Sequence, residues 1–156
     1  AFTSKDGKGL RKLSIAATQK QFEKGMRETV QAIKARGITP VIIGPVPNPG
    51  VDTVQCASRP IFRTLARAME MCHGLSQEQS RARNAPVIAV LKTISAEEGA
   101  IFIDPTPIFC RPDEATCTRM VKGRLIYRDD DHLSLYGARL LGGRVTRRIK
   151  QEQASP

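Results

Sequence analysis

The chain has 156 residues, of which 40% are hydrophobic, which suits one domain with a single core. No apolar run approaches the roughly 18 residues of a membrane span, and the basic start lacks the apolar stretch of a signal peptide. We therefore expect a soluble chain, with any targeting or membrane segment lying outside it. The net charge of +10 would suit nucleic acid, an anionic membrane surface or an acidic glycan. The basic residues are scattered, and with no Trp, five Phe and two Tyr a base-stacking platform is poorly supplied, so we expect no nucleic-acid partner.

The four cysteines are spaced in a way that favours disulfides over metal binding. Neither Cys56 and Cys72 nor Cys110 and Cys117 has the C-x-x-C spacing of zinc sites or thioredoxin-like motifs. The simplest of the three possible pairings joins Cys56 to Cys72 and Cys110 to Cys117. Two disulfides would indicate an oxidising compartment such as a periplasm. The alternative is four buried thiols in a cytosolic protein.

Helical and strand patterns alternate along the chain. The first half should contain a loop over 1–16, a helix from Thr18 to Arg36, a strand over 40–44, a loop over 45–50 and a partly helical stretch from Pro60 to Met71. A capping box of Ser76 and Gln79 then predicts a helix that runs to about Glu98, with a kink or break at Pro86. After it we expect a strand over 100–104, a loop over 105–123, a short strand over 125–127, and a helix capped by Ser134 that runs through Ile149. The expected inward faces are Phe22, Met26, Thr29, Val30 and Ile33 in the first helix, Val87, Leu91 and Ile94 in the second, and Leu135, Ala138, Leu141 and Val145 in the last.

This alternation favours an α/β fold with a parallel sheet. Two strong strands are too few for a complete sheet, and the first helix needs a sheet to pack on. We therefore expect a three-layer domain that is incomplete at its amino-terminal side. Such a chain would expose apolar faces and strand edges, so we expect poor solubility in isolation.

The run Tyr127-Arg128-Asp129-Asp130-Asp131-His132-Leu133-Ser134 is the most informative one for chemistry. Sites in open α/β sheets form at the carboxyl ends of the strands, and this run should lie there with Pro45–Gly50 and Asp104–Phe109. Histidine titrates near neutral pH, and a carboxylate three residues earlier could fold back to fix its tautomer. Two other interpretations remain open: the aspartates cap a helix, or they line a Ca²⁺ or Mg²⁺ loop, although the EF-hand spacing and glycine are absent.

The same run, followed by Tyr136-Gly137-Ala138, resembles the last block of the SGNH hydrolase superfamily, Asp-x-x-His. More closely, the chain resembles the SGNH domain fused behind the membrane acyltransferase-3 domain of bacterial glycan O-acyltransferases. The resemblance covers most of the chain: Arg36-Gly37, Val41 to Pro47, Cys56 with Arg59, Ile103-Asp104-Pro105, Phe109-Cys110, Cys117 and the Asp-His block.

The resemblance implies a flavodoxin-like sheet, with residues 1–156 forming the carboxyl-terminal portion of one SGNH domain. It implies His132 as the general base, Asp129 as its orienting carboxylate, and structural disulfides among the four cysteines. Asp130 and Asp131 occupy variable positions and receive no role. The family's nucleophilic serine belongs to a Gly-Asp-Ser block that is absent here, and Ser4 has the wrong context. We therefore expect no nucleophile in this chain.

The function that the resemblance implies is O-acyl transfer, with acetyl as the expected acyl group, to an envelope glycan. It implies a location at the periplasmic face of the bacterial inner membrane, with an upstream membrane acyltransferase domain as partner. A freestanding periplasmic carbohydrate esterase and a non-catalytic glycan-binding module are the alternatives. We expect no cofactor and no metal. Asp104 is expected to brace the loop after its strand, and His73 to be a surface or packing residue.

Overall fold

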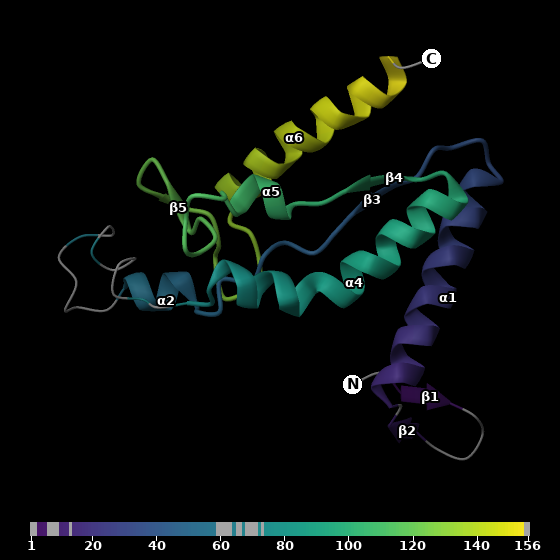
Figure 1. Ribbon diagram of the computed structural model, residues 1–156, viewed down its shortest axis with the longest axis horizontal. Helices are drawn as coiled ribbons and strands as arrows, with labels where there is room; N and C mark the ends of the chain where they lie inside the picture. The colour runs from purple at the N-terminus through teal and green to yellow at the C-terminus, as the bar shows by residue number, and fades with distance from the viewer. Residues whose placement is uncertain are drawn as a thin grey trace. The chain divides into compact units, whose positions relative to one another are not determined.

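The computed structural model describes residues 3–5, 10–12, 14–58, 64, 67, 72 and 74–154. The chain divides into two compact units, one of residues 1–42 with 90–102 and the other of residues 43–89 with 103–156. The predicted helical stretch from Pro60 to Met71 falls almost wholly outside the described residues. The elements are labelled in Figure 1.

The first unit opens with a hairpin where a loop was predicted. β1 (Thr3–Lys5) pairs antiparallel with β2 (Leu10–Lys12), so two short strands lie inside the predicted loop. The helix α1 (Ile15–Lys34) begins earlier than Thr18, because the Ser14 hydroxyl accepts the Ala17 N–H and caps the helix there. Gly37, with a φ of 73°, follows the end of the helix in the left-handed conformation that glycine adopts most easily.

The core of the first unit is apolar and lies between α1, β3 (Val41–Ile43), β4 (Ile101–Ile103) and the last turns of α4 (Gln77–Glu98). Its buried members are Val30, Ile42, Leu91 and Ile94, with Phe22 and Met26 packed against them. Thr29 is exposed and its hydroxyl donates to the Gly25 carbonyl, so its predicted inward position is wrong. Val87 is also exposed, at 40%, against the prediction.

The helix α4 begins with the predicted capping box. The Gln79 side chain accepts the Ser76 N–H at 3.0 Å, and the Ser76 hydroxyl accepts the Gln79 N–H at 3.1 Å. The helix then continues through Pro86 to Glu98 without interruption, so of the predicted kink or break the break is wrong and the kink stays a prediction. Proline removes one backbone hydrogen bond, and the packing of Leu91 and Ile94 in the core favours continuation of the helix beyond it.

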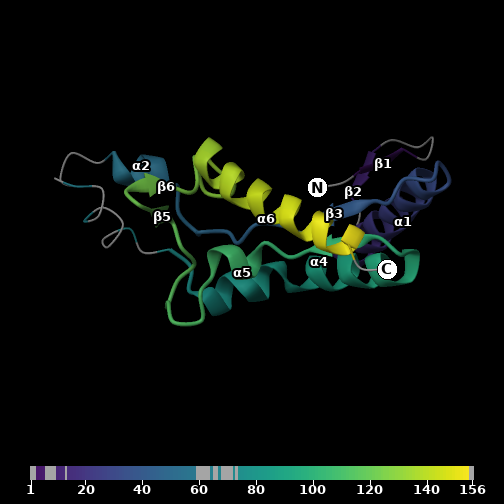
Figure 2. The same ribbon diagram turned by 90° about the horizontal axis from the view of Figure 1, so that it is seen from above.

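β3 and β4 form a small parallel sheet and run side by side in Figure 1; Figure 2 gives the same elements from above. The Ile101 N–H donates to the Pro40 carbonyl and the Gly44 N–H donates to the Ile103 carbonyl, each at 2.9 Å. The protein is thus of mixed α/β type, as predicted. The three-layer arrangement and its incompleteness at the amino-terminal side stay predictions.

The second unit has more short elements than predicted. α2 (Thr53–Ala57) was not anticipated, and α5 (Thr106–Phe109) and β5 (Met120–Val121) lie inside the predicted loop over 105–123. β5 pairs antiparallel with β6 (Arg124–Leu125), which begins one residue before the predicted strand.

The last helix, α6 (Leu135–Ala154), extends beyond Ile149, and its inward face matches the prediction in part. Leu135 is 71% exposed and Ala138 is exposed as well. Leu141 packs against the buried cluster of Phe109, Ile126 and Tyr127, as predicted, together with Tyr136 and Leu140. The prediction was wrong for Leu135 and Ala138, in the first turn of α6, where Gly137 lies against the Ile126 backbone and no apolar side chain of that turn is needed to fill the contact.

Both predicted disulfides are present, joining Cys56 to Cys72 and Cys110 to Cys117. All four cysteines are buried. The first disulfide packs with Val51, Ala57, Met120 and Leu125 and so connects α2 to the β5–β6 hairpin. The second closes the loop before that hairpin, where the Gln77 side chain donates to the carbonyls of Arg111 and Glu114.

Candidate active site

The loop between β6 and α6 carries the predicted site and is held by backbone hydrogen bonds at both ends. The Arg128 N–H donates to the His132 carbonyl at 3.0 Å, which closes the turn. The Ser134 N–H donates to the Ile126 carbonyl at 2.8 Å, and the Ser134 hydroxyl donates to the Leu125 carbonyl at 2.7 Å. The same hydroxyl accepts the Gly137 N–H at 3.1 Å, so Ser134 caps α6 as predicted.

Gly137 lets α6 begin directly against the end of β6. A Cβ at this position would lie 2.3 Å from the Ile126 carbonyl oxygen, closer than real Cβ atoms approach. Only glycine therefore fits without moving one of the two backbones. This contact fixes the start of α6 relative to the segment that carries His132.

Tyr127, directly before Arg128 in this loop, is fully buried. Its hydroxyl donates to the Pro47 carbonyl at 2.7 Å, and its own carbonyl accepts the buried hydroxyl of Thr53 at 3.1 Å. Burial raises the pKa of Tyr127 well above its usual value, so the phenol stays neutral and keeps its proton for this hydrogen bond. Tyr127 thereby joins the predicted site loop to the Pro45–Gly50 loop that follows β3.

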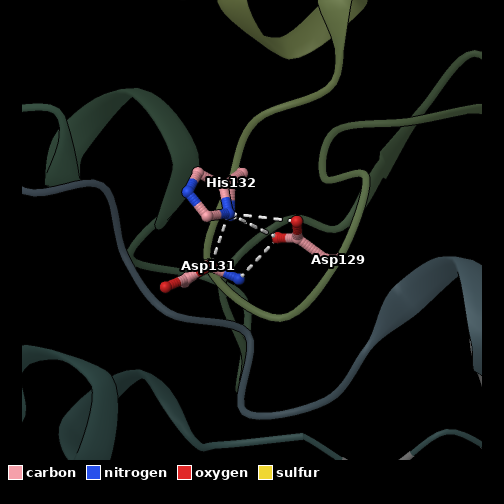
Figure 3. Close-up of side chains that lie close together, drawn as sticks. All are labelled: Asp129, Asp131 and His132. Carbon is pink, nitrogen blue, oxygen red and sulfur yellow. Dashed lines mark hydrogen bonds and ion pairs between the residues drawn. The ribbon is translucent and has the colours of Figure 1, made fainter.

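Asp129 folds back over the turn and contacts the ring of His132, as the spacing predicted (Figure 3). Its two carboxylate oxygens lie 3.0 and 3.1 Å from His132 Nδ1. One of them also accepts the backbone N–H groups of His132 at 2.6 Å and Asp131 at 3.1 Å. The carboxylate is thus fixed by the backbone of the same turn that carries the imidazole.

These hydrogen bonds keep Asp129 ionised. The His132 backbone N–H is the main cause that lowers the pKa of Asp129 to about 2; the Asp131 N–H and the imidazole act in the same direction, and desolvation opposes them. Arg128 adds a cation, with its Nε 3.4 Å from the carboxylate. At neutral pH the group facing His132 is therefore a carboxylate with its negative charge in place.

The contact also determines which nitrogen of His132 is available. A carboxylate can only accept a hydrogen bond, so Nδ1 must carry the proton in the neutral ring and Nε2 must carry the lone pair. Figure 3 shows Nε2 on the side of the ring away from both aspartates. The side chain of His132 is 61% exposed, so Nε2 is open to accept a proton from a reacting group.

Asp131 also reaches the imidazole, which the sequence did not predict. One of its carboxylate oxygens lies 2.7 Å from His132 Nδ1. Asp130, the other residue without an assigned role, is exposed, and no contact joins it to the ring among the described residues. Asp129, Asp131 and His132 offer ligand atoms within 4.8 Å of one another, so they could hold a cation, but Nδ1 would then lose its role as a donor.

The remaining candidate residues have structural positions. Asp104 accepts the Thr106 N–H at 2.9 Å and so braces the loop after β4, as expected. Ser4 lies in β1, and His73 is outside the described residues. Among the described helices, none has the length and apolar character needed to cross a membrane.

The chain belongs to the family described as the SGNH domain fused to AT3 domains, whose model matches residues 2–147. No curated protein matches it. Its fold is similar to that of a solved structure, the periplasmic domain of a lipopolysaccharide acetyltransferase from Salmonella ser. Paratyphi A, with a TM-score of 0.60 and 20% sequence identity. The match covers 84% of this chain and 50% of that one, so this chain spans about half the length of its structural relative. Family membership supports chemistry of the acyltransferase or esterase kind.

Proposed function

We propose that this chain is the carboxyl-terminal portion of an SGNH domain that transfers an acyl group, in the first instance acetyl, to a hydroxyl of an envelope glycan. The observation that carries the proposal is the Asp129–His132 pair: Nδ1 is held by a carboxylate and Nε2 is open, in a chain of the SGNH family. His132 is the general base and Asp129 orients it and stabilises its imidazolium.

In this proposal the nucleophile is a serine that lies upstream of Ala1 in a Gly-Asp-Ser block. Its oxygen attacks the carbonyl carbon of the acyl donor while His132 Nε2 takes the hydroxyl proton. When the tetrahedral intermediate collapses, the bond to the donor's leaving group breaks, and the imidazolium returns the proton to that group. The acyl group is left as an ester on the serine.

The second half of the reaction repeats the first with the acceptor. A glycan hydroxyl attacks the ester carbonyl, gives its proton to Nε2, and leaves as the O-acylated sugar while the serine recovers its proton. Water in place of the sugar would give hydrolysis, so the same residues serve a freestanding carbohydrate esterase. That esterase is the alternative function, together with a module that binds glycan without reaction.

The partner and the location follow from the same proposal. The family is described as SGNH domains fused to AT3 domains, which supports a membrane acyltransferase domain upstream on the same polypeptide. The two disulfides suit an oxidising compartment, and the structural relative is a periplasmic domain. We therefore assign the domain to the periplasmic face of the bacterial inner membrane.

The proposal is tested by locating the acyl group on the full-length protein. The protein is incubated with an isotopically labelled acyl donor, quenched in acid and mapped by peptide mass spectrometry, with and without a glycan acceptor. The expected result is a labelled serine upstream of Ala1 that loses its label when acceptor is added. Label lost equally fast to water would favour the esterase, and glycan binding with no labelled residue would favour the binding module.

A further inference from the structure

We propose that Asp131 is a second positioning residue for His132, one that shares the Nδ1 proton with Asp129 and replaces Asp129 when it is removed. This inference rests on the proposed function, because it concerns how the general base is held. It assigns a role to a residue between the Asp and the His of the family block.

The geometry gives Nδ1 more acceptors than it has protons. Three carboxylate oxygens lie within hydrogen-bonding distance of this single nitrogen: two from Asp129, at 3.0 and 3.1 Å, and one from Asp131, at 2.7 Å. The contacts with Asp129 are hydrogen bonds, whereas the one with Asp131 is an ion-pair contact that places its oxygen close enough to take the single Nδ1 proton as a second acceptor. Both carboxylates lie on the Nδ1 side of the ring in Figure 3, so both favour the same tautomer with Nε2 free.

The two carboxylates differ in what else they do. Asp129 also accepts two backbone N–H groups and lies beside Arg128, so its negative charge is spread over several partners. Among the described residues, the only contact found for the Asp131 carboxylate is the one with His132. Its charge is therefore directed at the imidazole, and it remains in place if Asp129 becomes an amide.

The consequence concerns the tautomer. In a Ser-His-Asp triad, which has one carboxylate, replacing that Asp with Asn leaves the imidazole in the wrong tautomer. This replacement lowers kcat by about 10⁴-fold in trypsin. Here Asp131 still accepts from Nδ1 after Asp129→Asn, so the correct tautomer persists. The loss in Asp129→Asn should then be about 10²-fold, and removal of both carboxylates should add a further 10- to 100-fold loss.

The test is a set of kcat and KM measurements on the full-length protein. The variants are Asp131→Asn, Asp129→Asn, Asp129→Asn with Asp131→Asn, and His132→Ala. Asp130→Asn and Asp129→Asn with Asp130→Asn are matched controls, since they make the same charge change one residue away in the same exposed loop. Asp131 is 58% exposed, so its replacement by Asn leaves the packing intact.

The expected results are specific. Asp131→Asn lowers kcat about two- to fivefold, as for the loss of one exposed ion pair, with KM unchanged. The kcat of the double variant Asp129→Asn with Asp131→Asn falls to within a few-fold of the kcat of His132→Ala. The kcat of the control, Asp129→Asn with Asp130→Asn, equals that of Asp129→Asn alone. If the two double variants have equal kcat, or if Asp131→Asn changes only KM, the inference is wrong. Full activity of His132→Ala would instead overturn the proposed function itself.

Discussion

Gly137→Ala is the substitution that tests most directly how the fold positions His132. The new Cβ would lie 2.3 Å from the Ile126 carbonyl oxygen, whereas real Cβ atoms stay beyond 3.0 Å, so the two backbones must separate by about 0.7 Å. The same carbonyl accepts the Ser134 N–H at 2.8 Å, so the separation weakens the bond that ends the His132 loop. We expect a loss of about 1–3 kcal/mol in unfolding free energy from overpacking. We also expect a fall in kcat that approaches 10²-fold, the cost of a displacement of about 1 Å in a catalytic group.

The assay compares Gly137→Ala with Gly142→Ala on the same helix, in the full-length protein. Gly142 has nothing within 4 Å of the position its Cβ would take, so alanine there should leave kcat unchanged and favour the helix by up to about 1 kcal/mol. Denaturant midpoints and acyl-transfer rates are measured for both. If Gly137→Ala matches Gly142→Ala in stability and rate, the close approach of α6 to Ile126 does not control the position of His132.

Three further predictions follow from the site and its supports. Tyr127→Phe removes the buried donor to the Pro47 carbonyl and should lower the unfolding free energy by about 1–3 kcal/mol; an unchanged denaturant midpoint would contradict this. Because the pKa of Asp129 is lowered from 3.8 to about 2, its stabilising effect is complete above pH 4 and is lost as the pH falls through about 2. In wild type the NMR titration of the Asp129 carboxyl carbon should therefore have its midpoint below pH 4, and a midpoint above pH 4 would contradict this. Replacing both Cys56 and Cys72 with Ser should cost about 3 kcal/mol in unfolding free energy, and both Cys110 and Cys117 slightly less because they close a shorter loop; equal midpoints in reduced and oxidised protein would refute this.

Local signals in the sequence predicted much of the fold. The capping box of Ser76 and Gln79, the apolar runs of β3 and β4, and the Ser134 cap each depend on residues a few positions apart, and each is present in the structure. The contact of Asp129 with His132 was predictable for the same reason, since both lie in one turn. The short elements α2 and α5 were missed because neither is long enough to show a helical period.

Tertiary contacts account for the rest. The inward face of α6 was predicted wrongly at Leu135 and Ala138, because Gly137 brings the first turn of the helix against Ile126, whereas Leu141 packs inward as predicted. The buried hydrogen bond of Tyr127 joins segments 80 residues apart, which no local pattern reports. Asp131 was left without a role because a run of aspartates does not indicate which of them turn toward the imidazole. Gly137 was the one sequence signal for the close approach of α6 to Ile126, because a glycine within a helix often marks a contact with another backbone segment.

The central claim is that His132 is the general base of an acyl transfer. The most direct measurement is the single-turnover rate of acyl transfer to glycan by purified full-length protein, for wild type and for His132→Ala, each with and without added imidazole. The account predicts that His132→Ala is slower by at least about 10³-fold, binds glycan as wild type does, and regains part of its rate with imidazole. A rate within a few-fold of wild type, or a loss explained by weaker glycan binding alone, would contradict it.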